Sequence, residues 1–202
     1  MTSIRMLVAV ALLVGAATAF AQEAPPAAVP PEVLPAAVPQ VNTQAGPAPG
    51  DLQGLSPEQV MQRIDVWGMD SEQNKVTSYV TDREIHAEFP GGSKFVVDLP
   101  ADRMLVAVAP YIRKTHDCGT HYPSSCLGEL ANAAARVTVT DAGGALVREI
   151  EASTLANGFL ELWLPRKALF QLTIEARGLK ASGPVSTAEK ADTCLTTFQL
   201  HP

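Results

Sequence analysis

The feature that most constrains the fold of this chain is a series of short segments in which apolar and polar residues alternate. Alternation with period two is typical of a strand that buries one face. Nine segments fit this pattern: 76–81, 84–89, 94–99, 104–111, 135–140, 146–151, 158–164, 170–176 and 193–200. Turn-forming runs such as Pro90-Gly91-Gly92 and Asn157-Gly158 separate them, as in hairpins. The pattern predicts a mainly β chain with an antiparallel, β-sandwich-like domain.

One short helix is expected before the strands. Ser56 is placed as the N-cap and Gln59 follows three residues later, which completes a capping box. Gly68 would end the helix in a left-handed conformation. The apolar stripe at helical spacing consists of Val60, Ile64 and Trp67. We expect this stripe, including Trp67, to pack against the following sheet.

The N-terminus has the pattern of a secretory signal peptide. Arg5 precedes an apolar run over 6–17, and the small residues Ala19 and Ala21 stand where signal peptidase cleaves. The run is shorter than the roughly 20 apolar residues that span a bilayer, and no later segment is long enough. We therefore expect cleavage near Ala21, export to the periplasm, and no membrane span in the mature chain.

An alanine- and proline-rich segment follows the predicted cleavage site. It contains eight prolines within residues 22–50, which favours an extended, solvated tether without a core. The sequence thus predicts a signal peptide at 1–21, a disordered linker at 22–50, a short helical region at 51–75, and a β domain at 76–202. The formal net charge of −6 argues against nucleic acid as a partner, since phosphate binding needs a basic surface.

Three cysteines carry the main functional signal. Cys118 and Cys126 flank a loop segment that contains His121, and Cys194 lies near the C-terminus. An odd number of cysteines in an exported chain leaves at least one sulfur for a metal, for redox exchange or for a partner chain. Because the segment 113–132 is the one long interruption of the strand pattern, it is the expected place for binding groups.

The ligand types favour a soft metal ion. Thiolates select Cu(I), so Cys118, Cys126 and Cys194 are candidate copper ligands. Zinc is the competitor, because three sulfurs and the His121 imidazole would make a tetrahedral Cys₃His site. The spacing of these residues does not distinguish the two metals. His116 is a second candidate nitrogen ligand, or alternatively a residue that supports the ligands.

The cysteines also allow interpretations without a metal ion. Two of them could form a disulfide that staples the loop, which would suit an interaction module without metal. A thiol oxidoreductase is a third possibility, although the chain has no CxxC motif. No nucleophile elbow, phosphate loop or HExxH helix is found in the sequence, and no activating motif supports a cysteine hydrolase that would use Cys118 or Cys126. Oxidation of a thiol pair to a disulfide could reduce Cu(II), which is a further enzymatic possibility.

The segment 109–130, APYIRKTHDCGTHYPSSCLGEL, resembles the signature of the CueP family of periplasmic copper-binding proteins. Further matches are NGF at 157–159, LWLP at 162–165 and TCLTT at 193–197, within a resemblance that spans roughly 55–200. The resemblance implies copper resistance in the bacterial envelope, reduction of Cu(II), and supply of copper to a periplasmic copper-zinc superoxide dismutase. It places the family's three cysteines on Cys118, Cys126 and Cys194, with His121 inside the first pair. The odd number of thiols separately allows a thiol–disulfide exchange partner.

Overall fold

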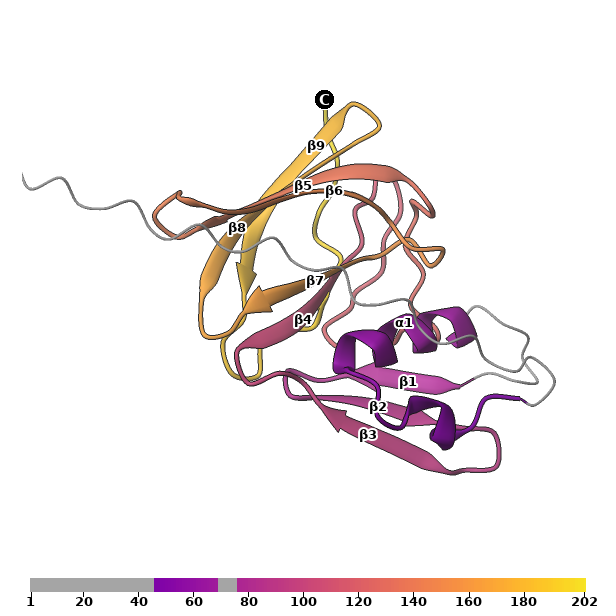
Figure 1. Cartoon of the computed structure of the whole chain (residues 1–202). Coiled ribbons are helices and arrows are strands. Elements are labelled where there is room, and N and C mark those ends of the chain that lie inside the picture. Colours follow the sequence, from indigo (N-terminus) through magenta and orange to yellow (C-terminus); the bar gives the residue numbers. More distant parts are fainter. Residues whose placement is uncertain (1–45, 69–75) are drawn as a thin grey trace, which may run out of the picture. The chain divides into compact units, whose positions relative to one another are not determined.

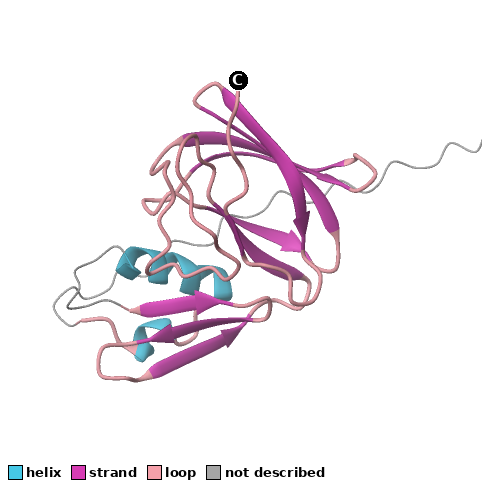
Figure 2. Ribbon diagram, turned by 180° about the vertical axis from the view of Figure 1, so that it is seen from behind, coloured by secondary structure: helices cyan, strands magenta, loops and turns pink. Residues whose placement is uncertain are grey.

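The structure is a computed structural model that describes residues 46–68 and 76–202. The predicted signal peptide and residues 22–45 of the predicted linker lie outside the described residues, as do residues 69–75. Figures 1 and 2 show the arrangement of the described elements.

The N-terminal part of the described chain is helical. A 3₁₀ helix, η1 (Pro49–Leu52), leads into α1 (Pro57–Gly68). The predicted capping box is present, since the Ser56 N–H donates to Gln59 Oε1 at 3.0 Å and the Gln59 N–H donates to Ser56 Oγ at 3.3 Å. The predicted stripe is buried, and Trp67 packs edge-on against Phe89 with ring centroids 5.9 Å apart.

The prediction that Gly68 adopts a left-handed conformation is wrong, because Gly68 is the last residue of α1 and its φ is not positive. A glycine is needed there for another reason. A Cβ at this position would lie 2.9 Å from the Ser124 Cα and 3.0 Å from the Pro123 carbonyl oxygen. The end of α1 therefore touches the backbone of the cysteine-bearing loop.

Within residues 46–68 and 76–202, the strands form three sheets. The first is antiparallel in the order β1-β2-β3, with β1 (Thr77–Val80), β2 (Glu84–Glu88) and β3 (Lys94–Asp98). The second has the order β10-β4-β7, with β4 (Arg103–Val108), β7 (Leu160–Pro165) and β10 (Cys194–Leu195). The third has the order β6-β5-β8-β9, with β5 (Ala134–Asp141), β6 (Leu146–Ser153), β8 (Leu169–Ala176) and β9 (Leu179–Ser186).

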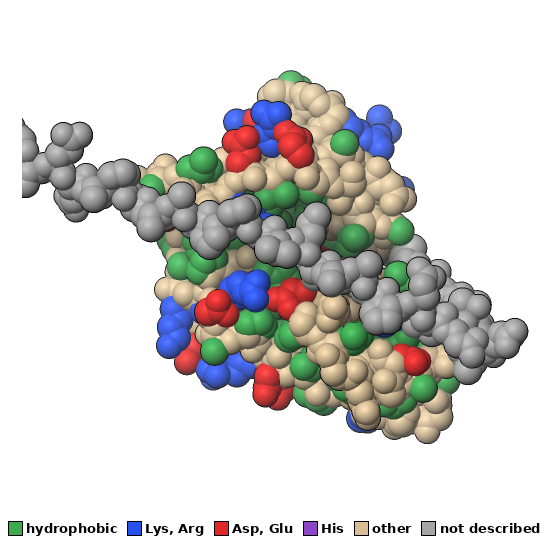
Figure 3. All heavy atoms as spheres, viewed as in Figure 1, with side chains coloured by type: hydrophobic (Ala, Val, Ile, Leu, Met, Phe, Trp, Pro, Cys, Tyr) green, Lys and Arg blue, Asp and Glu red, His purple; other side chains and the backbone are tan. Residues whose placement is uncertain are grey.

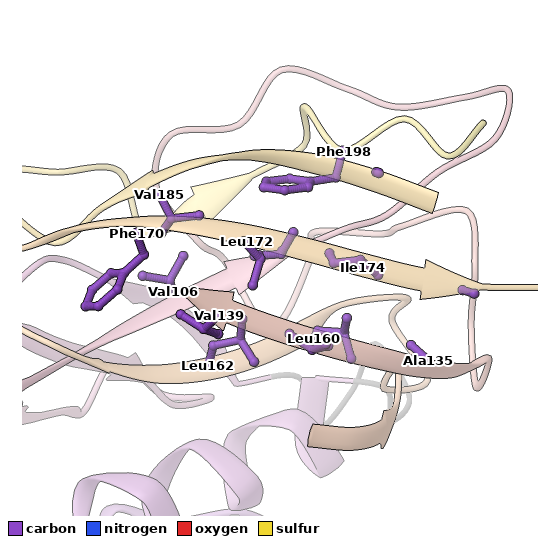
Figure 4. Packing of buried hydrophobic residues seen from close by; sticks show 14 of the residues in the cluster. Val106, Ala135, Val139, Leu160, Leu162, Phe170, Leu172, Ile174, Val185 and Phe198 are labelled. Carbon is purple, nitrogen blue, oxygen red and sulfur yellow. The ribbon is translucent and has the colours of Figure 1, made fainter. Parts of the chain in front are cut away.

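The second and third sheets pack face to face around the main core, which confirms the predicted β-sandwich-like fold. Figure 4 shows Val106 and Leu162 of the second sheet pointing toward Val139 and Leu172 of the third. These side chains are at most 4% exposed, and full burial of each contributes about 1.5–3 kcal/mol.

Strand β4 is buried along both faces and joins the parts of the fold. Its Val106 and Val108 face the sandwich core. Leu105 belongs to a second core, the core beneath α1, which apolar residues of α1 and of the first sheet form. Ala107 belongs to a small third cluster that contains Cys126 and Cys194. The alternation in β7 follows the prediction, because Leu162 faces the sandwich core and Trp163 packs on the core beneath α1. The far side of the second sheet is thus where the cysteines meet the helical region.

Two strand predictions are corrected by the structure. The predicted strand 193–200 is reduced to β10, two residues that pair in parallel with β4. The sequence pattern missed β9, which contains Gly183 and Pro184, residues that weaken a strand prediction. Proline is tolerated there because β9 lies at the edge of its sheet.

On the face shown in Figure 3, basic and acidic side chains of the described residues stand close together in small groups.

Candidate metal centre

The long connection between β4 and β5 carries Cys118 and Cys126 and is fastened to β1. The Val80 N–H donates to the His121 carbonyl oxygen at 2.8 Å, and the Ser78 N–H donates to Ser124 Oγ at 3.0 Å. Figure 2 shows this group of loops beside α1 and the first sheet. The edge of β1 therefore holds the loop in place.

Strand β10 brings the third cysteine to the same place. Cys194 pairs with Ala107 of β4, and the Ala107 N–H donates to the Thr193 carbonyl oxygen at 2.8 Å. The Ala109 N–H bonds the Leu195 carbonyl oxygen at 2.9 Å. The sandwich thus fixes the backbone on both sides of Cys194.

The structure brings all three cysteines together. Cys118 and Cys194 form a disulfide with their Cα atoms 5.4 Å apart, although 76 residues separate them in the sequence. Cys126 is a free thiol, 7% exposed, and its Sγ lies 3.5 Å from the Cys118 Sγ. A structure with Cys194 far from the loop would have excluded a shared thiolate site.

His116 completes a group of four potential ligands. One ligand atom from each of His116, Cys118, Cys126 and Cys194 lies within 4.8 Å of the others. Burial increases across the group, from an exposed His116, through a half-buried Cys118, to the buried Cys126 and Cys194. A surface depression lined by His116, Cys118, Tyr122 and Cys126 opens at this point, so the group is reached from the His116 side.

His121, the predicted nitrogen ligand, lies outside that group. Its side chain is fully buried, with Nε2 3.4 Å from Glu161 Oε1 and its ring centroid 4.8 Å from that of Phe159. His116 lies near the same phenyl ring, with the centroids 6.4 Å apart. The two histidines therefore differ in exposure, and His121 faces a carboxyl group in the interior.

Glu161 and Asp65 form a partly buried acid pair that links β7 to α1, and one carboxyl oxygen of each is inaccessible to solvent. Burial first, and then the charge of Glu161, raise the pKa of Asp65 to about 9. Burial raises the pKa of Glu161 to about 7, although a hydrogen bond from Asp65 partly offsets this effect. Asp65 is therefore protonated at neutral pH and donates to Glu161, which in turn faces His121.

The surroundings of Cys126 favour its ionised form. Burial opposes ionisation of the thiol, but hydrogen bonding by the His121 side chain and the Tyr122 backbone outweighs it, so the pKa of Cys126 is lowered. A thiolate is both the nucleophilic and the metal-binding form of cysteine. Cys126, the free thiol of the group, is thus activated both as a nucleophile and as a metal ligand.

The sequence alone did not identify Asp65, Glu161, Phe159 or Thr193 as parts of this region. Glu161 lies in the predicted strand 158–164, but nothing in the sequence pairs it with a residue of the helix. The NGF motif that contains Phe159 was noted as part of the family resemblance without a role. The clearest available signal was a carboxylate, Glu161, in an otherwise apolar strand.

Three sulfurs and one imidazole lie close enough to hold a soft or borderline metal ion once the disulfide is reduced, so the fold and the site define a β protein with a candidate metal centre. The family model described as "Periplasmic copper-binding protein CueP" matches residues 59–199. The chain belongs to the CueP family, which confirms the resemblance noted in the sequence.

A solved structure supports the same assignment. The crystal structure of S.CueP matches with a TM-score of 0.68 and 32% sequence identity, over 75% of this chain and 92% of that chain. No curated protein sequence matches the chain. Within the described residues, no helix has the length and apolar character needed to cross a membrane.

Proposed function

We propose that this chain sequesters Cu(I) in the periplasm and so contributes to copper resistance, with Cys118, Cys126 and Cys194 as thiolate ligands. Copper is the cargo of the protein in this proposal. The observation that carries it is the convergence of all three sulfurs with one imidazole within 4.8 Å. Cu(I) accepts such low-coordinate, sulfur-rich surroundings.

His116 is the better-placed nitrogen ligand, because its ring nitrogen belongs to the group and that of the predicted His121 does not. In our proposal His121 acts on the site through Cys126, by favouring the thiolate. The exposed position of His116 also suits a ligand that a recipient protein displaces first. The recipient suggested by the family resemblance is a periplasmic copper-zinc superoxide dismutase.

Redox chemistry of the cysteines would control how many sulfurs are free. The Cys118–Cys194 disulfide leaves Cys126 and His116 as the unbonded members of the group. A thiol–disulfide exchange partner must supply two electrons to the disulfide before three thiolates can bind one ion. In the reverse direction, oxidation of the two thiolates to the disulfide yields two electrons, which reduce two Cu(II) to two Cu(I).

The same step would weaken metal binding, because two thiolates are lost as the disulfide forms. Reduction of Cu(II) and release of Cu(I) to a recipient would then be coupled. Copper transfer would proceed by ligand exchange at the exposed side of the group.

The N-terminal predictions belong to this proposal. Cleavage near Ala21 would release the protein into the periplasm, with the part of the alanine- and proline-rich segment 22–50 that precedes η1 as a tether. The family's periplasmic location agrees with such a route.

An anaerobic titration of the fully reduced protein with Cu(I) against a competing chelator tests the proposal. Replacing Cys118, Cys126 and Cys194 together by serine is expected to abolish competition for Cu(I). Ser125→Ala is the matched control, since Ser125 is exposed and lines the same depression. Equal affinity in the wild type and the triple variant would reject the thiolate site.

Zinc is the runner-up metal, because the same four residues satisfy a tetrahedral Cys₃His site. A disulfide-stapled interaction module without metal is the other alternative, and the disulfide is the observation in its favour. Parallel titrations with Zn²⁺ and Cu(I) distinguish the copper protein, the zinc protein and the interaction module without metal. Tighter binding of Zn²⁺ favours a zinc protein, and uptake of neither ion after reduction favours the module.

A further inference from the structure

The disulfide raises the question of what holds Cys194 in place once it is reduced. In the described state, Cys194 is bonded to Cys118 and lies on β10, which has two residues. Reduction removes the covalent link across 76 residues of sequence. A site that binds metal in the reduced state therefore needs another means of keeping these sulfurs together.

The side chain of Thr193 joins two other segments at this point. Thr193 is 2% exposed, and its hydroxyl donates to the Val80 carbonyl oxygen at 2.6 Å. The same oxygen accepts the His121 N–H at 3.0 Å. One hydroxyl thus connects the residue before Cys194 to β1 and to the loop between Cys118 and Cys126.

The backbone around Thr193 reaches the residue next to Cys118. The N–H groups of Thr193 and Cys194 both donate to the Gly119 carbonyl oxygen, at 2.9 Å and 3.2 Å. None of these contacts involves a sulfur atom. The hydroxyl of Thr193 adds a hydrogen bond to the loop at His121, so three segments are held beside Cys194.

We propose that Thr193 is a positioning residue that holds Cys194 beside Cys118 and Cys126 in the reduced protein. This inference deepens the proposed copper function and rests on it for its metal-binding consequence. Loss of the hydroxyl leaves two buried groups, the Val80 carbonyl and the His121 N–H, without their partner. The reduced loop then loosens, whereas the oxidised loop is still held by the disulfide.

Two equilibria should respond together. Binding of one Cu(I) by separate thiolates and closure of the Cys118–Cys194 disulfide both depend on the effective concentration of Cys194 at the loop. A residue that raises this concentration favours both, so its removal weakens both. A residue that supports only the overall fold would lower thermal stability without changing either equilibrium.

The test uses Thr193→Val, which keeps the branched shape and removes the hydroxyl, and Thr193→Ser, which keeps the hydroxyl. Thr187→Val is the matched control. Thr187 is also buried, and its hydroxyl donates to the Pro165 carbonyl oxygen at 2.7 Å and accepts the Ala168 N–H at 3.1 Å. Its hydrogen bonds tie the start of β8 rather than the cysteine group.

For each protein, the Cu(I) affinity of the reduced form and the disulfide equilibrium constant in glutathione buffers are measured. Thr193→Val is expected to lower both by about tenfold, or about 1.4 kcal/mol each. Thr193→Ser should recover most of the loss, and Thr187→Val should leave both constants at the wild-type value.

Unchanged constants in Thr193→Val, with a loss of thermal stability similar to that of Thr187→Val, would overturn the proposal. So would failure of Thr193→Val to fold in either redox state while Thr187→Val folds, because Thr193 would then serve the fold in general. If the wild type binds no Cu(I), the copper function fails, but the disulfide equilibrium still tests the positioning role.

Discussion

Replacement of Gly128 by alanine tests how the cysteine loop is packed. Gly128 lies two residues after Cys126, and its N–H donates to the Asn157 carbonyl oxygen at 2.6 Å. A Cβ at this position would lie 2.6 Å from the Gly158 carbonyl oxygen and 3.0 Å from its carbon. Gly158 cannot easily move aside, because its φ of +85° belongs to a turn that leads directly into the buried Phe159.

The size of the effect follows from these distances. Ordinary van der Waals contact begins near 3.4 Å, so the two backbone segments must separate by about 0.8 Å. Such overpacking typically costs about 1–3 kcal/mol, and we expect about 3 kcal/mol here because both partners are backbone. For a folded part of about 150 residues, this loss corresponds to a fall in Tm of about 6–12 °C.

Urea unfolding and calorimetry of the oxidised protein measure this change. Gly50→Ala is the matched control, since Gly50 has no positive φ and nothing lies within 4 Å of its added Cβ. The displaced Cys126 should also weaken Cu(I) binding in Gly128→Ala. Unfolding free energies of Gly128→Ala and Gly50→Ala that agree within about 0.5 kcal/mol would refute the packing argument.

Three further predictions follow from the site and the N-terminus. Asp65→Asn should flatten the pH dependence of the free energy of unfolding. Because the pKa of Asp65 is raised in the folded protein, protonation of Asp65 favours folding. The free energy of unfolding of the wild type therefore falls between about pH 4 and about pH 9, by at most about 1.4 kcal/mol per pH unit. Urea unfolding at about pH 5 and about pH 8 checks this, and equal slopes in both proteins would contradict it. His116→Ala should lower Cu(I) affinity about tenfold or more. His121→Ala should mainly slow alkylation of Cys126 at neutral pH. A large loss of Cu(I) affinity in His121→Ala but not in His116→Ala would assign the ligand role to His121. N-terminal sequencing of periplasmic protein should begin at Gln22, and a start at Met1 would exclude cleavage.

Local signals in the sequence predicted much of the fold. The capping box at Ser56 and Gln59 and the alternation in β7 depend on neighbouring residues, so both could be predicted without knowledge of the fold. Strand β9 could not, because its place at a sheet edge is what makes Pro184 acceptable. The role of Gly68 also escaped prediction, since it depends on contact with Pro123 and Ser124, far along the chain.

The candidate site was predictable in its sulfurs and less so in its nitrogen. Cysteine in an exported chain is informative by type, and the three cysteines do meet in the structure. Which histidine joins them depends on the path of the loop: the carbonyl of His121 is tied to β1, and its side chain is buried against Phe159 and Glu161. The Asp65–Glu161 pair joins a helix to a strand of another layer, a contact that sequence spacing does not reveal.

X-ray absorption at the copper K-edge of reduced protein, loaded with one equivalent of Cu(I) without oxygen, tests the thiolate site most directly. A site of three thiolates should give a monovalent edge and a first coordination shell dominated by sulfur, which loses sulfur when Cys118, Cys126 or Cys194 is replaced by serine. A first shell of nitrogen and oxygen alone, or a sulfur shell that the three replacements leave unchanged, would contradict it.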